Sequence, residues 1–254
     1  MDHRFSEQEV TQFRRDGYII ERGLLPPEAV QTMRDAALRD LRQTVGPVEF
    51  EADTHYPGAP ASLDAPGGRT VRRLLQAYAR DPSFRVWSTA APIAERLRQL
   101  IGPAVLISQA HHNCVMTKAP DFSSLTSWHR DIRYWAFERP ELVSVWFALG
   151  RETEDNGCLR VLPGTHVMDF REGRLDDEQF LRTDVAENAA LLAGGVAAEL
   201  DAGDVLFFHC RLFHAAGRNQ SNETKLSPVF TYRAADNLPK AGTRSARLPD
   251  IPLP

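Results

Sequence analysis

The spacing of hydrophobic residues predicts helices in the first hundred residues. After prolines 26 and 27, hydrophobic residues recur at intervals of three and four, as on one face of an amphipathic helix: Val30, Met33, Ala37 and Leu41. The capping-box sequence Ser6-Glu7-Gln8-Glu9 predicts an earlier helix that runs into a short strand. A third helical region opens at Asp81 and ends at Gly102. Residues 1 to about 102 are therefore expected to be mainly helical.

After Gly102 the pattern changes to the alternation that is typical of β-strands. Between Leu142 and Leu149, large apolar residues occupy every second position, and Trp146 lies among the residues that face the other way. About eight such stretches follow one another to about residue 235, separated by Gly and Pro turns. Helices followed by strands predict a mainly β jelly roll with buttressing helices. The chain length favours a single domain over residues 1–254, with its core at about 103–235.

Two long stretches interrupt this pattern, residues 44–70 and residues 167–195. The first is rich in Gly and Pro, and the second carries an acidic helical segment. Long loops in compact domains are often functional, so we expect at least one of these stretches to border a pocket and close over it. Surface excursions far from any site are the alternative. The Pro-rich tail after Leu238 is expected to pack on the surface.

Composition narrows the class of protein. The 254 residues carry a net charge of −4 without a block of like charges, which does not favour a nucleic-acid-binding surface. No apolar run approaches the length of a membrane span, and the N-terminal region lacks the apolar segment of a secretory signal. The cysteines are odd in number and form no C-x-x-C pair: Cys114, Cys158 and Cys210. They are expected to be reduced and buried in a cytoplasmic protein.

The segment Trp128-His129-Arg130-Asp131 contains a candidate metal site. Side chains two residues apart on a strand point to the same face, so His129 and Asp131 can act together. With a second histidine from another strand they would form the 2-His-1-carboxylate triad of non-haem Fe(II) oxygenases. Read alone, a histidine and an aspartate on a strand are more often solvated or hydrogen-bonded than bound to a metal.

Six motifs follow one another in order over residues 114–233. They are Lys118–Asp121, Trp128–Asp131, Val145–Leu149, Asp155–His166, Ala202–Asp204 and His214–Ser221. Together they resemble the phytanoyl-CoA dioxygenase family of Fe(II)/2-oxoglutarate oxygenases, and the Asn-Gly-x-Leu-x-Val-x-Pro-Gly-Thr-His string that ends at His166 is the most specific of them. The resemblance implies a double-stranded β-helix (jelly roll, cupin-like). It also implies Fe(II), the cosubstrate 2-oxoglutarate and O2, with succinate and CO2 as products.

The family order assigns a role to each histidine. It implies that His214 is the distal metal ligand, whereas His209 is expected to lie outside the metal's ligands and to line or support the pocket. His166 is expected to hold a turn. His111 and His112 are neighbours on a predicted strand, so one of them is expected to face the cavity. We take His112 as the candidate substrate contact.

The cosubstrate site departs from the family pattern. The family's clamp for the remote carboxylate of 2-oxoglutarate is an arginine eleven residues after the distal histidine, and this chain has Lys225 there. A lysine keeps the charge but lacks the planar, two-pronged geometry of arginine. The family's serine two residues after that histidine is replaced by Ala216, and Ser227 could supply the missing donor from the same strand face as Lys225. A surface lysine with the cosubstrate held elsewhere is the alternative.

The resemblance adds further candidate contacts. It implies that Trp146 and Cys114 line the 2-oxoglutarate pocket, although both residue types are equally normal in a core. It also places Arg73 near a cationic cosubstrate contact. Arg130 stands where glutamine is common in the family, and it is expected either to face solvent or to pair with an anionic group of the substrate or of the protein.

The function that these residues predict is an Fe(II)- and 2-oxoglutarate-dependent dioxygenase that hydroxylates a small organic molecule. Asp131 favours oxidation over halogenation, because related halogenases have a small residue at this position. The alternative from another class is a non-catalytic double-stranded β-helix protein that binds a metal or ligand. A cupin enzyme without 2-oxoglutarate fits less well, since such sites usually carry three or more histidines and a glutamate.

Overall fold

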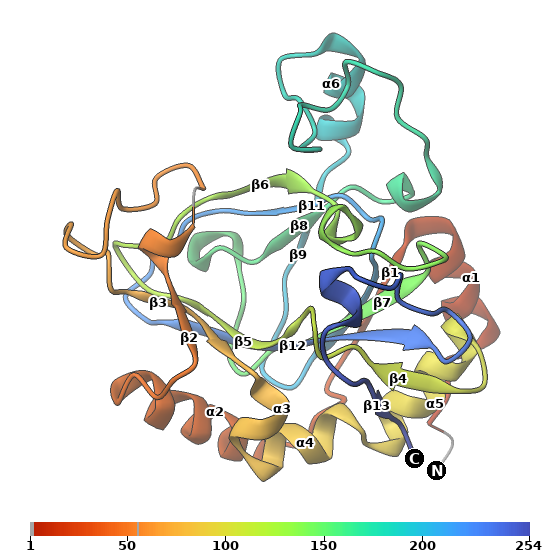
Figure 1. Ribbon diagram of the computed structural model, residues 1–254, viewed down its shortest axis with the longest axis horizontal. Coiled ribbons are helices and arrows are strands. Elements are labelled where there is room, and N and C mark those ends of the chain that lie inside the picture. The colour runs from red at the N-terminus through yellow and green to blue at the C-terminus, as the bar shows by residue number, and fades with distance from the viewer. Residues whose placement is uncertain (1–2, 55) are drawn as a thin grey trace.

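The computed structural model describes residues 3–54 and 56–254, whose helices mostly lie on one side of two β-sheets (Figure 1). The α-helices are α1 (Glu7–Asp16), α2 (Pro27–Arg42), α3 (Ala77–Arg80), α4 (Pro82–Ser88), α5 (Ala91–Ile101) and α6 (Ala186–Ala193). Short 3-10 helices are η1 (Glu51–Asp53), η2 (Asp131–Tyr134), η3 (Glu154–Asn156), η4 (Thr165–Val167) and η5 (Arg244–Ala246). None of the helices in these described ranges is long and apolar enough to cross a membrane.

The predicted helix starts are confirmed at two positions. The Ser6 side chain accepts a hydrogen bond from the Glu9 backbone, and the Glu9 carboxylate accepts one from the Ser6 backbone, so the capping box of α1 is formed. Gly17 ends this helix with φ at +83°, a backbone conformation that glycine adopts without strain. The second helix begins at Pro27 and buries the predicted apolar positions 30, 33 and 37. Both predictions rest on local signals, which is why they hold.

Thirteen strands are formed by the described residues. They are β1 (Tyr18–Glu21), β2 (Val48–Phe50), β3 (Val71–Leu75), β4 (Val105–Ile107), β5 (Asn113–Lys118), β6 (Thr126–His129), β7 (Leu142–Phe147), β8 (Leu159–Val161), β9 (Val196–Ala198), β10 (Val205–His209), β11 (His214–Ala216), β12 (Lys225–Ala234) and β13 (Ile251–Pro252). The larger sheet runs β1-β10-β7-β12-β5-β3-β2, with β4 and β13 attached through β12, and the smaller sheet runs β6-β11-β8-β9. All their pairings are antiparallel, and the predicted jelly roll is confirmed.

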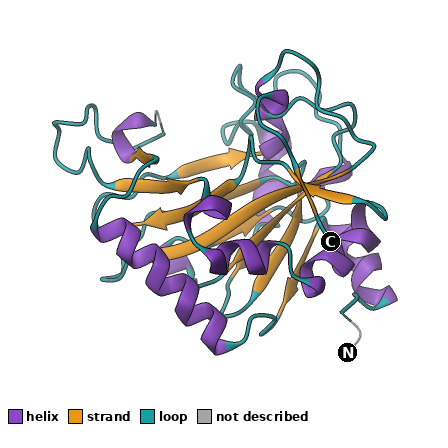
Figure 2. Ribbon diagram, turned by 60° about the horizontal axis from the view of Figure 1, so that its bottom comes forward, coloured by secondary structure: helices purple, strands orange, loops and turns teal. Residues whose placement is uncertain are grey.

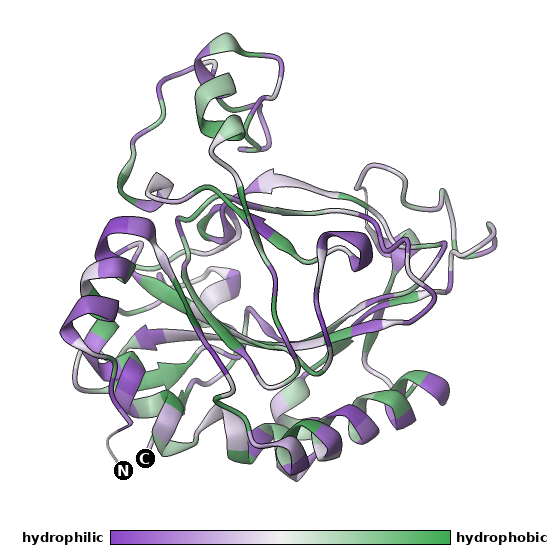
Figure 3. Ribbon diagram, turned by 180° about the vertical axis from the view of Figure 1, so that it is seen from behind, coloured by the Kyte–Doolittle hydropathy of each residue, from purple (hydrophilic) through white to green (hydrophobic). Residues whose placement is uncertain are grey.

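The larger sheet separates two apolar regions. Residues of α2, α4 and α5 pack on its outer face (Figure 2), where alternate residues of β7 are buried against them, as the sequence predicts: Val143, Val145 and Phe147. The residue between, Trp146, points to the opposite face and joins the cluster between the two sheets. Hydrophobic stretches accordingly concentrate on the strands, while the helices alternate hydrophobic and polar residues (Figure 3). The inner face of the larger sheet therefore packs against the smaller sheet.

The part before residue 102 is less purely helical than the pattern predicts. Besides the expected β1, it contributes β2 and β3, which extend the larger sheet beyond β5. Residues 44–70, read from the sequence as a loop, thus contain β2 and η1. These strands are short, and their pairing partners are distant in sequence, so local periodicity does not reveal them.

Candidate active site

The two predicted histidine ligands are neighbours on adjacent strands of the smaller sheet. His129 ends β6, His214 begins β11, and these two residues are directly paired in the antiparallel register. Their imidazole centroids are 4.3 Å apart. Antiparallel pairing puts directly opposed side chains on the same face, so strand register alone brings the two rings together.

Asp131 completes the cluster from outside the strand. The prediction that it continues the strand of His129 is wrong, because β6 ends at His129 and Asp131 begins η2. The residue between them, Arg130, is nevertheless extended, with φ −114° and ψ 134°. The two-residue spacing therefore still turns both side chains to one side. Asp131 Oδ1 lies 3.8 Å from Nε2 of His129 and 3.6 Å from Nε2 of His214.

The protonation of this cluster suits a divalent metal. Nδ1 of His129 lies 2.9 Å from the Ser127 carbonyl oxygen, and Nδ1 of His214 lies 3.0 Å from that of Leu212. Each Nδ1–H can therefore donate to the backbone, which leaves the Nε2 lone pairs free to bind a metal. Burial lowers the pKa of His129 to about 3, so its imidazole is neutral near pH 7. One potential ligand atom from each of the three residues lies within 4.8 Å of the others, so the residues fit one ion.

His112 supports the carboxylate of this cluster. Its Nδ1 lies 3.6 Å from Asp131 Oδ2, whereas the contacts of His129 and His214 are to Oδ1. Burial raises the pKa of Asp131, but the nearby histidines and Arg73 outweigh this effect, and the pKa lies below its ordinary value. Asp131 is therefore held as a carboxylate, the form in which it can bind a cation.

Both histidines of the pair 111 and 112 line the larger pocket, so the expectation that only one faces the cavity is wrong. They lie in an irregular segment before β5, where strand alternation does not apply. Nε2 of His111 lies 2.8 Å from Ser245 Oγ, and its ring packs 4.9 Å from that of Trp135.

A small cavity of about 60 Å³ lies behind the triad, between the two sheets. Its walls include most of the predicted cosubstrate contacts, namely Arg73, Trp146 and Lys225. Cys114 and Arg73 line the adjoining larger pocket. Burial raises the pKa of the Cys114 thiol to about 11, so this side chain is a neutral wall element.

Lys225, which lines the small cavity, forms a buried ion pair that the sequence did not predict. Lys225 Nζ lies 3.0 Å from Oε2 of Glu152, whose side chain is 1% exposed. Ser227 Oγ donates to Glu152 Oε1 over 2.6 Å, and Trp146 Nε1 donates to the same carboxylate over 3.0 Å. The alternative reading of Lys225 as a surface residue is therefore wrong. A buried ammonium without a partner is costly, so a buried Lys225 requires a carboxylate nearby. This requirement was the one indication of Glu152 that the sequence offered.

Three other residues singled out in the sequence lie away from the cluster. Arg130, a candidate substrate contact, lines neither pocket, and its guanidinium lies over the rings of Phe170 and Phe213 at 5.5 and 5.1 Å. His209 accepts a hydrogen bond from the Arg211 backbone, packs 5.2 Å from His166, and lines neither pocket. His166 is buried within η4, in the turn where it was expected.

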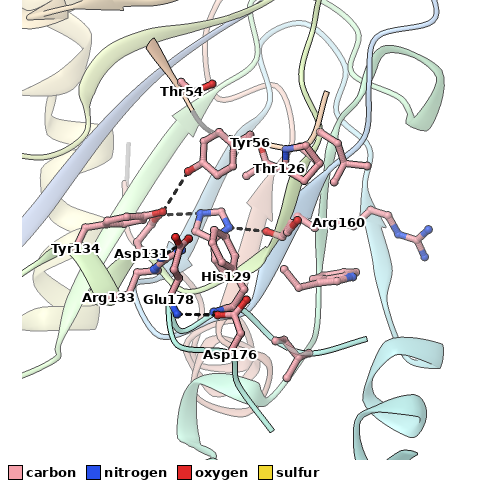
Figure 4. A pocket seen from close by; sticks show the side chains of 18 of the residues that line it. Thr54, Tyr56, Thr126, His129, Asp131, Arg133, Tyr134, Arg160, Asp176 and Glu178 are labelled. Carbon is pink, nitrogen blue, oxygen red and sulfur yellow. Dashed lines mark hydrogen bonds and ion pairs between the residues drawn. The ribbon is translucent and has the colours of Figure 1, made fainter. Parts of the chain in front are cut away.

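The larger pocket, about 1430 Å³, is bordered by both long stretches. Tyr56, from residues 44–70, places its hydroxyl 3.2 Å from that of Tyr134 (Figure 4). Phe180, from residues 167–195, lies 6.0 Å from the ring of His129 and 3.9 Å from the guanidinium carbon of Arg133. Arg133 also pairs with Glu178 at 3.7 Å. The two stretches therefore meet aromatic and charged residues of η2 beside the metal cluster.

The chain is similar to known proteins in both sequence and structure. The family model described as "Phytanoyl-CoA dioxygenase (PhyH)" matches residues 13–227. The human peroxisomal phytanoyl-CoA dioxygenase is 25% identical over 235 residues, which cover 88% of this chain and 67% of the relative. Ectoine dioxygenase from Sphingopyxis alaskensis is 26% identical over 253 residues, which cover 93% and 78%. A crystal structure of EctD from S. alaskensis with 2-oxoglutarate and 5-hydroxyectoine aligns with a TM-score of 0.76 at 23% identity, over 93% of this chain and 78% of that one.

Proposed function

We propose, from the premise that the chain belongs to the phytanoyl-CoA dioxygenase family, that it hydroxylates a small organic molecule. It is an Fe(II)- and 2-oxoglutarate-dependent dioxygenase, which couples conversion of 2-oxoglutarate and O2 into succinate and CO2 to oxidation of a substrate. The observation that carries the proposal is the opening of one buried His129, Asp131 and His214 cluster onto two adjoining cavities. One cavity suits the cosubstrate, and the other suits the substrate.

The metal would be held by the three residues of the cluster. Bound Fe(II) supplies the activation of O2 and the site at which the 2-oxo acid is oxidised. The protein's share is to present two imidazole nitrogens and one carboxylate from the same side. The backbone carbonyls of Ser127 and Leu212 fix the rings, so little rearrangement is required when a metal binds.

The cosubstrate would extend from the metal cluster into the small cavity. We assign its remote carboxylate to the end formed by Lys225 and Ser227, whose polar atoms lie 3.5 Å apart. Trp146 and Cys114 would provide the walls, and Arg73 a second positive charge on the metal side. Arg73 already pairs with Glu49 at 3.3 Å, and its buried Nε has no hydrogen-bond partner among the described residues.

The substrate would occupy the larger pocket. Its walls combine aromatic side chains with arginines and carboxylates, which fits a small molecule that carries both apolar and charged or polar groups. Three of its lining residues lie beside the cluster: His112 next to Asp131, and Tyr134 and Phe180 next to the ring of His129. Closure by the two long stretches would exclude water from the reaction. The relatives named for ectoine and phytanoyl-CoA differ so widely that they do not select one substrate for this chain.

The compartment that we propose is the cytoplasm. The three cysteines are free and buried, which fits a reducing environment. The non-catalytic alternative is not favoured, because both the metal cluster and the cation for a cosubstrate are present in one connected site. The test is to incubate the protein with Fe(II), 2-oxoglutarate and a panel of small molecules, and to measure succinate and products that have gained one oxygen atom. Absence of any 2-oxoglutarate-dependent succinate would contradict the proposed function.

A further inference from the structure

Lysine is rare in this chain, and its placement is selective. The sequence contains 30 lysine and arginine residues, of which three are lysine: Lys118, Lys225 and Lys240. Two of these three are buried, at 8% exposure each, and both line the small cavity beside the metal cluster. Lys240 is exposed. Nearly all other basic residues of the chain are arginine. Lysine, whose ammonium is compact and carried on a flexible side chain, is therefore found mainly at this cavity.

The two buried lysines are cross-strand neighbours. Lys118 is the last residue of β5 and Lys225 the first of β12, and the two are directly paired in the register. Directly opposed residues point to the same face with Cβ atoms roughly 4.5–5.5 Å apart, and like charges at such positions destabilise a sheet. A buried pair of ammonium groups therefore calls for negative charge nearby.

Among the residues that the structure describes, a carboxylate contacts only one of these two lysines. Glu152 contacts Lys225 and is itself held by Ser227 and Trp146. Lys118 Nζ donates to the Ser124 carbonyl oxygen over 3.0 Å, and within residues 3–54 and 56–254 no carboxylate lies within 4.0 Å of it. The carboxylate of Glu51 favours the charged form of Lys118 electrostatically, but it already forms an ion pair with Arg72 at 3.2 Å. An ammonium has three donors, so Lys118 retains donors for a ligand.

The glycine of the Asn-Gly motif makes room for this lysine. Gly157 has φ at +73°, and a Cβ added there would lie 2.7 Å from Cε of Lys118 and 2.6 Å from the Gly217 carbonyl oxygen. Gly157 also lines the small cavity. A side chain at this position would displace the stem of Lys118, so the motif and the lysine belong to one arrangement.

We propose that Lys118 is a second binding residue for the remote carboxylate of 2-oxoglutarate and contacts it together with Lys225. The inference rests on the proposed function and adds a residue to its cosubstrate site. Because the positive charge of Lys225 is balanced by the carboxylate of Glu152, Lys118 supplies the net positive charge that matches one incoming carboxylate. The proposal gives each of the two opposed lysines a carboxylate partner. Lys225 pairs with Glu152 inside the protein, and Lys118 pairs with 2-oxoglutarate when it binds.

The test is the variant Lys118→Met, which keeps the length of the side chain and removes its charge. Binding of 2-oxoglutarate to the Mn(II)-loaded full-length protein, measured by calorimetry, is expected to weaken about 30-fold, or about 2 kcal/mol at 1.4 kcal/mol per tenfold. Lys240→Met, the matched change at the exposed lysine, should bind as the wild type does. A wild-type affinity in Lys118→Met would overturn the inference and leave the proposed function intact.

A selectivity measurement keeps the test independent of small losses in stability. The wild type should prefer 2-oxoglutarate to 2-oxoglutaramate, its amide analogue at the remote end, and Lys118→Met should lose most of this preference. A purely structural role of Lys118 would weaken both ligands equally, and that result would contradict the inference. If the wild type itself bound neither ligand and formed no succinate, the proposed function and the inference would both fail.

Discussion

Lys225 Nζ lies 3.0 Å from Oε2 of Glu152, so the position of the family's arginine is occupied here by a buried lysine with an internal carboxylate partner. Ser227 and Trp146 donate to the same carboxylate, which fixes its orientation. An ion pair of this kind costs desolvation energy, and removal of one partner leaves the other charged and buried. The pair therefore has consequences for stability as well as for cosubstrate binding.

Lys225→Ala is expected to raise the concentration of 2-oxoglutarate required for half-maximal activity about 30-fold or more, because a charged hydrogen-bond donor to the remote carboxylate is lost. Steady-state kinetics with varied 2-oxoglutarate measures this change. Lys225→Arg keeps the charge and should retain more affinity if the cavity accommodates the guanidinium. An unchanged requirement in Lys225→Ala would move the clamp elsewhere, and Arg73 would be the next candidate because it lines both pockets.

Glu152→Gln is expected to reduce the free energy of unfolding by about 3–5 kcal/mol, the range found when one partner of a buried pair is removed. Urea unfolding monitored by tryptophan fluorescence measures the loss. The double variant Glu152→Leu with Lys225→Met removes both charges and should recover part of it. Equal losses in the single and double variants would show that the pair contributes little and that packing around Glu152 dominates.

The affinity for 2-oxoglutarate is expected to fall as pH rises through about 7. Burial and the positive charge of Lys225 lower the pKa of Lys118 to about 7, so the ammonium that binds an anion is present below this pH and is lost above it. Arg72 and Arg218 also oppose its charge, and Glu51 favours it. Calorimetry at several pH values measures the trend, with Lys118→Met as the control that should lack it.

The lowered pKa of Lys118 also predicts how the stability of the ligand-free protein changes with pH. The folded pKa of Lys118 lies below its ordinary value of 10.5, so between these pH values the unfolded chain binds more protons than the folded chain. This residue's contribution to the free energy of unfolding without ligand should therefore increase as pH rises from about 7 towards 10. A decrease confined to the wild type and absent from Lys118→Met would contradict the assigned pKa.

Both long stretches at the mouth of the larger pocket are expected to be cleaved first in limited proteolysis of the ligand-free protein. Contacts through Tyr56 and Phe180 link residues 44–70 and 167–195 to the site, so metal, 2-oxoglutarate and substrate together should slow cleavage there. Mass spectrometry of the fragments locates the cuts. Cleavage that is equally fast with all ligands present would remove these stretches from the gate, leaving the tail after Leu238 as the next candidate.

How much of this site the sequence could predict depended on where each signal lies. The spacing of His129 and Asp131 predicted that they lie together, and the family order predicted His214 beside them, although Asp131 leaves the strand for η2. Glu152 was missed because it follows β7 in a polar segment, and its burial depends on Lys225 and Ser227 from a strand more than 70 residues later. The short strands β2 and β3 were missed for the same reason, since long-range pairing rather than local alternation creates them.

The most direct test of the account is succinate formation from 2-oxoglutarate by the wild type and by Asp131→Ala. Asp169→Ala, which removes an exposed carboxylate paired with Arg211, serves as the matched control. The account predicts that the wild type and the control form succinate only with Fe(II) and O2 present. It predicts that the rate in Asp131→Ala falls by a factor of about 100 or more. A factor of 100 corresponds to an increase of about 2.7 kcal/mol in the activation barrier. Full succinate formation by Asp131→Ala would contradict the assignment of His129, Asp131 and His214 as the catalytic metal site.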